Sequence, residues 1–420
     1  MKEKRVVVTG FGALSCAGNG VEALWRAVSE GHCELGAITR FDTSAYRTRI
    51  AGEIKDFDVT RYMSPKEAKR VDRFCQYAIG AADEALADAG LPSDLRTAGE
   101  AVDVDRVGVM VSSGIGGLET ITEQIRILTE RGPGRVSPLL IPMMISDLAS
   151  GNISIRTGAA GPNFGVVSAC STGCHSIGES MWAIKRGDAE IMICGGAEAS
   201  VTEVGLAGFC SMKAMSTRND DPLHASRPFD LNRDGFVMSE GSGVLVLEEL
   251  EHAKRRGARI HAEVIGYGAT GDAYHITSPA PDGSGAARAM LMALRHAGIA
   301  PSEVDYINAH GTSTHLNDKF ETQAIKSAFG EAAKKIAVSS TKGAIGHALG
   351  AAGGLESIIC IRALETGIVP PTINYETPDP ECDLDVTPNQ AVKRDLRVAL
   401  NSNLGFGGHN GALLFRRWEA

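Results

Sequence analysis

Hydrophobic residues recur along the chain in one repeated pattern. A short run of β-branched residues is followed by a loop of Gly, Ser, Thr or Ala, and then by a segment in which apolar residues return every three or four positions. Such runs predict buried strands, and the segments after them predict helices. Because strands alternate with helices, we predict an α/β protein with a largely parallel sheet. The predicted strand regions are 6–10, 107–114, 190–196, 304–311, 336–341 and 398–403.

The segment around Cys170 carries the clearest candidate chemistry. Residues 165–170 are predicted to form a strand that stops at Cys170, and apolar residues at helical spacing over 174–184 predict a helix directly after it. The immediate neighbours of Cys170 are all small. A cysteine at a helix N-terminus meets unpaired N–H groups and the positive end of the helix dipole, which lower the pKa of its thiol. We therefore predict that Cys170 is a nucleophile, with a buried structural cysteine as the alternative.

The middle of the chain contains a break between two similar halves. A strand is predicted over residues 241–249 and a short charged helix over 250–256; Gly257 then separates this helix from the apolar run 260–265. We place a boundary there, which divides the chain into residues 1–256 and 257–420.

An insertion at residues 119–149 interrupts the first half. It contains a Gly-Pro turn and then the apolar stretch 139–145. Core packing is one explanation for this stretch, and a wall of an apolar substrate pocket or a subunit contact is the other.

Composition and charge exclude several classes of protein. The 420 residues are 43% hydrophobic and 22% charged, and the net charge of −9 argues against a nucleic-acid partner. The nine cysteines are odd in number and form no CxxC pair, which argues against a zinc site and indicates a reducing compartment. Met1–Arg5 runs directly into Val6–Val8 without a hydrophobic signal region, and no long uncharged apolar run follows. We predict a cytoplasmic protein without a membrane span, metal or cofactor.

A glycine pattern at Gly266–Gly271 matches the loop that binds dinucleotides. That loop must open a helix, and residues 272–285 contain two prolines and two further glycines. We therefore do not predict nucleotide binding.

Two histidines and a lysine lie in loops that follow predicted strands. His310 comes at the end of region 304–311, and His347 follows region 336–341; helical apolar spacing resumes after each. A histidine at a helix N-terminus tends to be neutral, because the dipole opposes a second proton, and neutral imidazole can donate an N–H to an oxyanion. Lys342 is either an ordinary surface lysine or orients this same site. Sites on such sheets gather beyond the strand ends, where Cys170, His310, Lys342 and Phe406 would all lie.

These motifs resemble those of the β-ketoacyl-[acyl-carrier-protein] synthases, and among them the class II elongating enzymes. The resemblance spans nearly the whole chain. It implies a thiolase-like fold of two duplicated βαβαβαββ halves in five αβαβα layers, usually as a homodimer. The motifs that carry it are Ser168-Ala-Cys-Ser-Thr-Gly173, Asn308-Ala-His-Gly-Thr-Ser-Thr314, Ser340-Thr-Lys-Gly-Ala-Ile-Gly-His347 and Gly405-Phe-Gly-Gly408.

The resemblance also implies a role for each residue of the site. Cys170 would accept the acyl group, while His310 and His347, supported by Lys342, would assist decarboxylation of a malonyl thioester and stabilise the enolate. The backbone N–H groups of Cys170 and Phe406 would form the oxyanion hole, and Phe406 would gate access to the sulfur. Substrate-binding residues would be Ile115, Phe209, Thr312 and Thr314.

The implied reaction is a decarboxylative Claisen condensation that extends an acyl chain in fatty-acid synthesis. A condensing enzyme of polyketide or specialised lipid assembly is an alternative, as is a non-catalytic carrier-binding or chain-length subunit. His315 and Leu404 depart from common residues of the family, which leaves the preferred chain length open.

The implied partner is an acyl carrier protein, which is acidic. A chain of net charge −9 needs a local basic patch to attract it. A solvated helix face is the alternative explanation for the charges. The candidate docking residues are Lys66, Lys69, Arg70 and Lys213.

Overall fold

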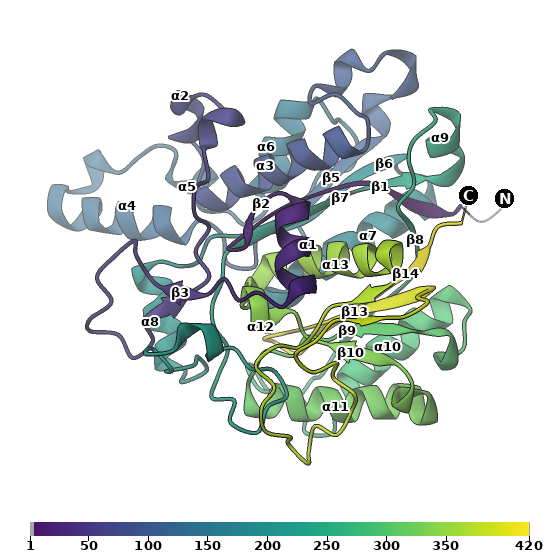
Figure 1. Ribbon diagram of the computed structural model, residues 1–420. Helices are drawn as coiled ribbons and strands as arrows, with labels where there is room; N and C mark the ends of the chain where they lie inside the picture. Colours follow the sequence, from purple (N-terminus) through teal and green to yellow (C-terminus); the bar gives the residue numbers. More distant parts are fainter. Residues whose placement is uncertain (1–3, 420) are drawn as a thin grey trace.

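Strands and helices alternate along the chain and stack in five layers (Figure 1). The computed structural model describes residues 4–419, so Met1, Lys2 and Glu3 of the predicted N-terminal segment lie outside the described residues. One outer layer is formed by α3 (Arg73–Asp88) and α6 (Leu148–Thr157), the central layer by α7 (Thr172–Arg186) and α13 (Ala352–Thr366), and the other outer layer by α10 (Ser284–Ala297) and α11 (His315–Phe329).

The two strand layers between these helices join edge to edge in one ten-stranded sheet. They meet where the first residues of β1 pair antiparallel with the first residues of β8. The order is β10-β9-β13-β14-β8-β1-β7-β6-β5, with β2 paired to β1. The strands are β1 (Val6–Ser15), β2 (Gly18–Asn19), β5 (Val107–Ser112), β6 (Ile191–Glu198), β7 (Gly241–Glu249), β8 (Ala262–Gly271), β9 (Tyr306–Asn308), β10 (Ala337–Ser339), β13 (Val398–Gly405) and β14 (His409–Arg417).

The second half of the chain has the expected order of elements. If a four-residue helix at 342–345 and two short strands at 368–369 and 392–393 are set aside, it runs β8-α10-β9-α11-β10-α13-β13-β14, which is the predicted βαβαβαββ unit. The first half repeats this order except at its third strand. There only Asn163 bridges Val109 of the edge strand β5, and residues 164–168 belong to no strand. The predicted strand before Cys170 is therefore wrong, because the pairing with β5 stops after Val109. The Ser150 hydroxyl accepts the N–H group of Val111 and donates to its carbonyl oxygen, so the next backbone groups of β5 that could pair with this segment are already bonded.

The prediction of a largely parallel sheet is also wrong. Only β5–β6, β9–β10 and β9–β13 pair in parallel in the main sheet, and its other neighbouring strands are antiparallel. Helices cover both faces of the sheet, so antiparallel strands such as β7 and β14 are buried on both faces and have the continuous apolar sequence that is typical of parallel strands. The predicted short helix after β7 is confirmed as α9 (Leu250–Arg255). The boundary near Gly257 stays a prediction.

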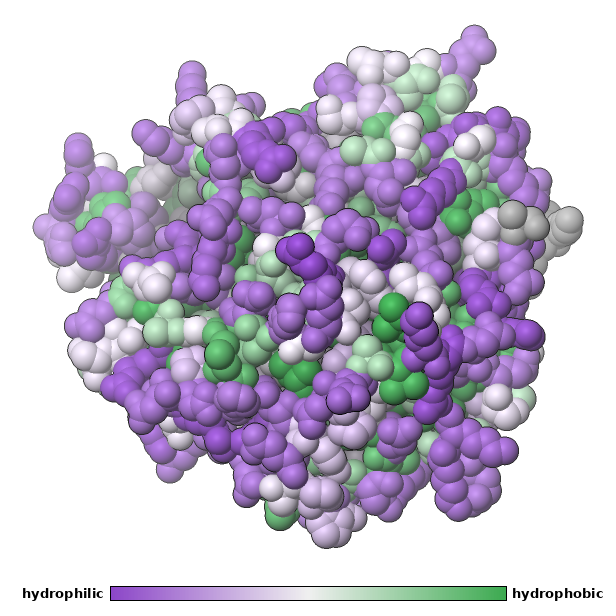
Figure 2. All heavy atoms as spheres, viewed as in Figure 1, coloured by the Kyte–Doolittle hydropathy of each residue, from purple (hydrophilic) through white to green (hydrophobic). Residues whose placement is uncertain are grey.

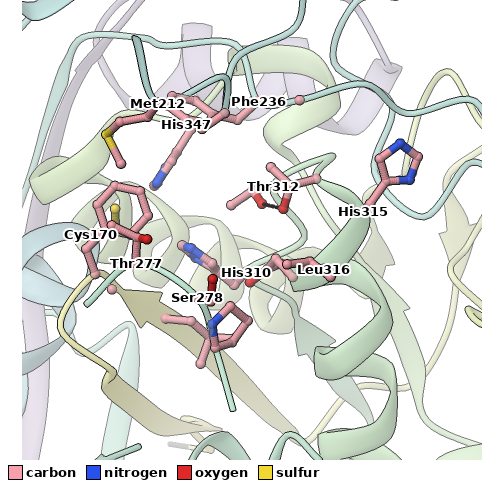
Figure 3. A pocket seen from close by; sticks show the side chains of 18 of the residues that line it. Cys170, Met212, Phe236, Thr277, Ser278, His310, Thr312, His315, Leu316 and His347 are labelled. Atoms are coloured by element: carbon pink, nitrogen blue, oxygen red, sulfur yellow. Dashed lines mark hydrogen bonds between the residues drawn. The ribbon is translucent and has the colours of Figure 1, made fainter. Parts of the chain in front are cut away.

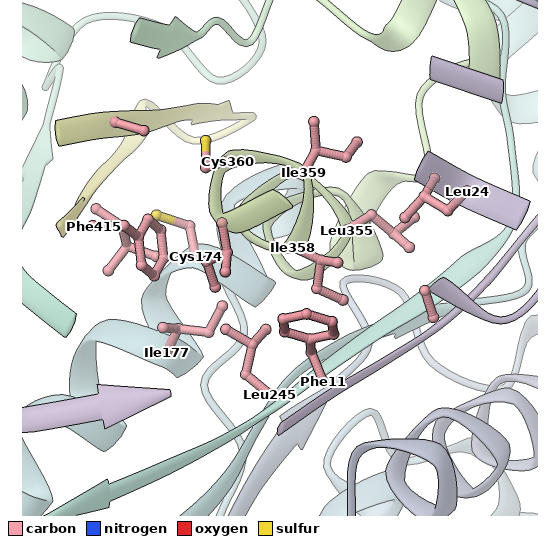
Figure 4. Packing of buried hydrophobic residues seen from close by; sticks show 14 of the residues in the cluster. Phe11, Leu24, Cys174, Ile177, Leu245, Leu355, Ile358, Ile359, Cys360 and Phe415 are labelled. Atoms are coloured by element: carbon pink, nitrogen blue, oxygen red, sulfur yellow. The ribbon is translucent and has the colours of Figure 1, made fainter. Parts of the chain in front are cut away.

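The main core lies around the central helices. Leu355 and Ile358 of α13 pack with Phe11 of β1 and Leu245 of β7, and all four side chains are buried (Figure 4). Burial of one such side chain stabilises the fold by about 1.5–3 kcal/mol. Small residues let α7 approach the sheet closely: a Cβ at Gly178 would lie 2.3 Å from the Tyr267 ring. Because α7 begins two residues after Cys170, this packing also fixes the nucleophile segment.

The insertion forms an arm at the left of Figure 1, built from α4 (Leu118–Arg131) and α5 (Leu140–Met144). None of the residues of α5 is buried, and 58% of Ile141 is exposed. Core packing is therefore wrong as an explanation for stretch 139–145. The remaining helices are α1 (Val21–Glu30), α2 (Pro65–Ala68), α8 (Glu203–Ser211) and α12 (Lys342–Ile345), and two small sheets pair β3 (Gly36–Ala37) with β4 (Ile50–Ala51) and β11 (Ile368–Val369) with β12 (Val392–Lys393).

The surface seen in Figure 2 is mainly hydrophilic, with apolar side chains in small separate groups. Within residues 4–419, no helix is both long and apolar enough to cross a membrane.

Candidate active site

Cys170 lies in a tight turn that leads into the central helix. Residues 169–171 form a 3-10 turn, and α7 continues from Thr172, so the predicted position of Cys170 at a helix start is confirmed. Ala169 has a φ of 51°, a left-handed conformation that costs a non-glycine residue roughly 1–2 kcal/mol. Surrounding backbone holds this turn in place: a Cβ at Gly405 would lie 2.6 Å from the carbonyl oxygen of Ser168.

The Cys170 thiol is buried, with 7% of the residue exposed. Burial raises the pKa of the thiol to about 12; Lys342 opposes this shift, and Glu198 adds to it. The predicted low thiol pKa is therefore wrong, because desolvation of the charged sulfur outweighs the effect of the helix start. The backbone N–H groups of Phe406 and Cys170 nevertheless donate toward the sulfur and favour its charged form.

His310 and His347 lie edge to face, with ring centroids 5.1 Å apart. Burial and then the charge of Lys342 lower the pKa of both imidazoles well below the usual range, and His347 lowers that of His310 further. Both rings are thus neutral, as predicted. The cause is different from the predicted helix dipole, since α11 and α13 begin five residues after His310 and His347 respectively.

Lys342 begins α12 and is 1% exposed, so it is not a surface lysine. Its ammonium forms an ion pair with the carboxylate of Glu356, on α13. The Asn403 side-chain amide donates to the other carboxylate oxygen at 2.5 Å. This pair holds a positive charge near both histidines, where it opposes their protonation.

Cys170, His310 and His347 face one cavity of about 340 Å³, whereas Lys342 does not line it (Figure 3). Cys170 and Phe209 reach it from the first half of the chain, and His310, His347 and Phe406 reach it from the second. Phe209 and Phe406 lie near each other, with ring centroids 6.4 Å apart. Thr312, Thr314 and Lys213 also line the cavity, and the two threonine hydroxyls are 3.1 Å apart.

The structure does not bring every predicted site residue to this cavity. Ile115 is not on its wall, and 37% of that residue is exposed. Lys66 on α2 and the following Lys69 and Arg70 are exposed. Figure 1 shows α2 well separated from α8, the helix that precedes Lys213.

Comparison with protein families agrees with this geometry. Residues 3–253 match the model of the β-ketoacyl synthase N-terminal domain, and residues 261–376 match that of the C-terminal domain. The chain belongs to the β-ketoacyl synthase family.

Curated relatives of this β-ketoacyl synthase align over its full length. It is 51% identical over 419 residues to 3-oxoacyl-[acyl-carrier-protein] synthase 2 of Synechocystis sp., which covers 100% of this chain and 99% of the relative. It is 52% identical over 419 residues to the protein of the same name from Staphylococcus aureus (strain COL), with 100% of both chains covered.

Solved structures of ketosynthases have the same fold. One is a type II polyketide ketosynthase in complex with its acyl-carrier protein, with a TM-score of 0.91 and 34% identity over 99% of this chain and 100% of that one. Another is the ishigamide ketosynthase/chain length factor, with a TM-score of 0.90 and 36% identity over the same shares of the two chains. The predicted thiolase-like fold is confirmed.

Sequence reasoning missed three buried carboxylates around the site of this synthase. Glu321 on α11 accepts the backbone N–H groups of His310 and Gly311, each at 2.7 Å, and burial raises the pKa of this carboxyl to about 7. Glu356 holds Lys342, and Glu198 ends β6. The available signal was a lone acidic residue inside an apolar stretch, which is clearest for Glu356 in 351–361.

Proposed function

We propose that this β-ketoacyl synthase catalyses the decarboxylative Claisen condensation of a Cys170-bound acyl chain with malonyl-acyl-carrier-protein. The products are 3-oxoacyl-acyl-carrier-protein and carbon dioxide, as in fatty-acid elongation. The observation that carries this proposal is the convergence of one buried cysteine and two neutral histidines on a single cavity. The names of the two curated relatives support the acyl carrier substrate.

The first half-reaction loads the acyl chain. The Cys170 sulfur attacks the carbonyl carbon of the acyl thioester, a new carbon–sulfur bond forms, and the bond to the carrier sulfur breaks. The proton of the Cys170 thiol leaves with the carrier, which departs as a free thiol. Negative charge on the carbonyl oxygen is held by the N–H groups of Cys170 and Phe406, and one such donor is typically worth about 2.7–4 kcal/mol in the transition state.

The second half-reaction uses the histidines. The carbon–carbon bond between the malonyl carboxylate and the α-carbon breaks, carbon dioxide leaves, and the electron pair stays on an enolate. N–H groups of His310 and His347 donate to the enolate oxygen. Neutral imidazoles are weak acids, so they stabilise this charge without protonating the carbon. The α-carbon then attacks the acyl thioester, and Cys170 leaves as a thiolate that takes up a proton.

A direct assay tests this proposal. The protein is incubated with a medium-chain acyl-carrier thioester and malonyl carrier, and carbon dioxide and product mass are measured. We expect carbon dioxide release and a 3-oxoacyl product two carbons longer. Absence of product from folded protein would contradict the reaction. A preference for 3-oxoacyl over saturated primers would favour the polyketide alternative. The two solved ketosynthase structures are the observation behind this alternative, and both are less similar to this chain than the curated relatives are.

We infer that the acyl carrier protein docks on the exposed basic residues of the α2 segment and on Lys213 at the cavity. Reversal of Lys69 and Arg70 to Glu should raise KM for the carrier substrate roughly three- to tenfold, since each exposed charge pair contributes about 0.2–1 kcal/mol. It should also flatten the dependence of KM on salt, because salt screens the attraction between the two proteins.

A matched control uses Lys334→Glu with Lys335→Glu, which makes the same charge change on exposed residues that do not line the cavity. Turnover of a small thioester mimic should be unaffected in both double variants. Equal loss with carrier and mimic would mean that the α2 residues support the fold instead of docking.

We propose that Ile115 limits the length of the acyl chain. It follows Gly114, where an added Cβ would lie 2.9 Å from the Ala169 carbonyl, so its loop touches the nucleophile turn. Ile115→Ala should shift preference toward primers longer by one or two carbons, since each methylene of the acyl chain that becomes buried is worth about 0.8 kcal/mol. Competition between primers measures the shift. The exposed Ile155→Ala is the control, and an unchanged profile in Ile115→Ala would contradict this role.

We infer that the synthase is a homodimer whose subunits cover its exposed apolar side chains near the arm. Four of them belong to the arm, and Phe164 and Val167 belong to the unpaired segment 164–168, which leaves backbone groups open to a second copy. Sedimentation should give twice the 44.2 kDa mass of one chain, and Phe164→Asp should shift it toward one chain. A monomer at micromolar concentration would contradict the inference. The side chains concerned are Ile115, Ile125, Leu128, Ile141, Ile145, Phe164 and Val167.

A cytoplasmic location stays a prediction from the sequence. It is supported by the nine cysteines, all of which are free, as expected for a reducing compartment.

A further inference from the structure

β6 ends in a buried carboxylate that the reaction described above does not use. Glu198 is fully buried and accepts four hydrogen bonds. Its Oε1 accepts from the hydroxyls of Ser113 at 2.6 Å and Ser200 at 2.9 Å. Its Oε2 accepts from the backbone N–H groups of Gly114 at 3.0 Å and Gly350 at 3.1 Å. None of these four partners is charged, so the carboxylate is held by neutral donors alone.

The two glycines belong to loops that come from opposite halves of the chain and touch around Cys170. A Cβ at Gly350 would lie 2.3 Å from the Gly114 nitrogen, and a Cβ at Gly114 would lie 2.9 Å from the Ala169 carbonyl oxygen. A Cβ at Gly173 would lie 3.1 Å from the Gly350 carbonyl oxygen. The two loops are therefore in backbone contact with each other and with residues on both sides of the nucleophile.

We propose that Glu198 is a positioning residue for Cys170. By accepting one N–H from each loop on the same oxygen, it keeps Gly114 and Gly350 at a fixed separation. Those loops in turn support the strained turn at Ala169 and the start of α7, which direct the Cys170 sulfur toward the oxyanion donors and the histidines. The inference rests on the condensation proposed above.

The chemistry of the four donors requires a carboxylate at this position. A glutamine offers one acceptor oxygen and one NH₂ group. Its NH₂ group would therefore point at either the two hydroxyls or the two backbone N–H groups, all of which donate in the present arrangement. Ser113 is poorly placed to adapt, because its oxygen already accepts the N–H groups of Ile115 at 3.2 Å and Gly116 at 2.7 Å. Within residues 4–419, the Ser200 hydroxyl donates to Glu198 and accepts no N–H group of this loop.

Burial raises the pKa of the Glu198 carboxyl to about 7 and its four hydrogen bonds oppose this shift, so the residue carries a partial negative charge at neutral pH. Loss of that charge would also act on the sulfur directly. Burial raises the pKa of Cys170, Lys342 opposes that shift, and Glu198 raises the pKa further; His310 and His347, which face the same cavity, are neutral. Glu198→Gln thus makes the thiol easier to ionise while it misplaces the sulfur. Easier ionisation should speed alkylation of the thiol, whereas misplacement of the sulfur should slow condensation. A role in stability alone would lower both rates together.

The test compares Glu198→Gln with the unchanged protein in three measurements. These are condensation kinetics, alkylation of Cys170 by iodoacetamide followed by peptide mass spectrometry, and thermal unfolding. We expect kcat to fall by about tenfold or more, KM to stay within about twofold, and alkylation to be at least as fast as in the unchanged protein. Condensation within about twofold would overturn the proposal, and so would a parallel loss of both rates with a large fall in Tm.

A pair of serine variants keeps the proposal testable if Glu198→Gln does not fold. Ser113→Ala removes the donor that also organises the loop, whereas Ser200→Ala removes the other Oε1 donor. We expect a lower kcat for Ser113→Ala and a kcat within about twofold for Ser200→Ala; equal effects would overturn the proposal. Lack of product from the unchanged protein would instead contradict the proposed condensation, so the two failures are distinguishable.

Discussion

Replacement of Cys170 by alanine is expected to abolish acyl transfer and, with it, condensation. No other described cysteine lines the cavity, so no second thiol can take over the acyl group. Loss of a covalent nucleophile costs far more than loss of a supporting residue, and we expect a fall of about 10³-fold or more. Intact-protein mass spectrometry after addition of the acyl carrier substrate should show no acyl adduct.

Cys174→Ala is the matched control for this variant. Cys174 lies one turn further along α7 and is buried in the main core. Its replacement should cost on the order of 1 kcal/mol of folding free energy and leave acylation intact. An acyl adduct on folded Cys170→Ala would show that another residue is the nucleophile.

Replacement of His310 or His347 by alanine is expected to separate the two half-reactions. Each variant should lose condensation by about 10²–10³-fold, because one donor to the enolate oxygen is removed. Cys170 should still be acylated, since its oxyanion donors are backbone N–H groups of Cys170 and Phe406. Acylation is followed by intact mass, and condensation by carbon dioxide release.

The exposed His32→Ala serves as the control, because its ring lies outside the cavity lining and pairs with Glu30 at 3.4 Å. It should behave as the unchanged protein in both measurements. If folded His310→Ala and His347→Ala both failed to acylate Cys170, the proposed division between loading and condensation would be wrong.

Local sequence was sufficient for most elements and for the identity of the central groups. Apolar spacing predicted α7, α11 and α13, because residues three and four positions apart lie on the same face of a helix. The positions of His310 and His347 after β9 and β10 were also predictable locally, because each strand ends where small residues replace β-branched ones. The resemblance to condensing enzymes rested on these short motifs and was confirmed by relatives that align over the full chain.

Strand direction and the electrostatics of the site were decided only by the tertiary structure. Central strands buried on both faces have the same apolar sequence whether they pair in parallel or antiparallel, so the sequence alone could not distinguish β7 or β14 from a parallel strand. The pKa of Cys170 depends on how deeply the turn is buried and on the charges of Lys342 and Glu198. Both residues are distant from Cys170 along the sequence and belong to other elements. Desolvation and charge act through space, and only the folded chain sets those separations.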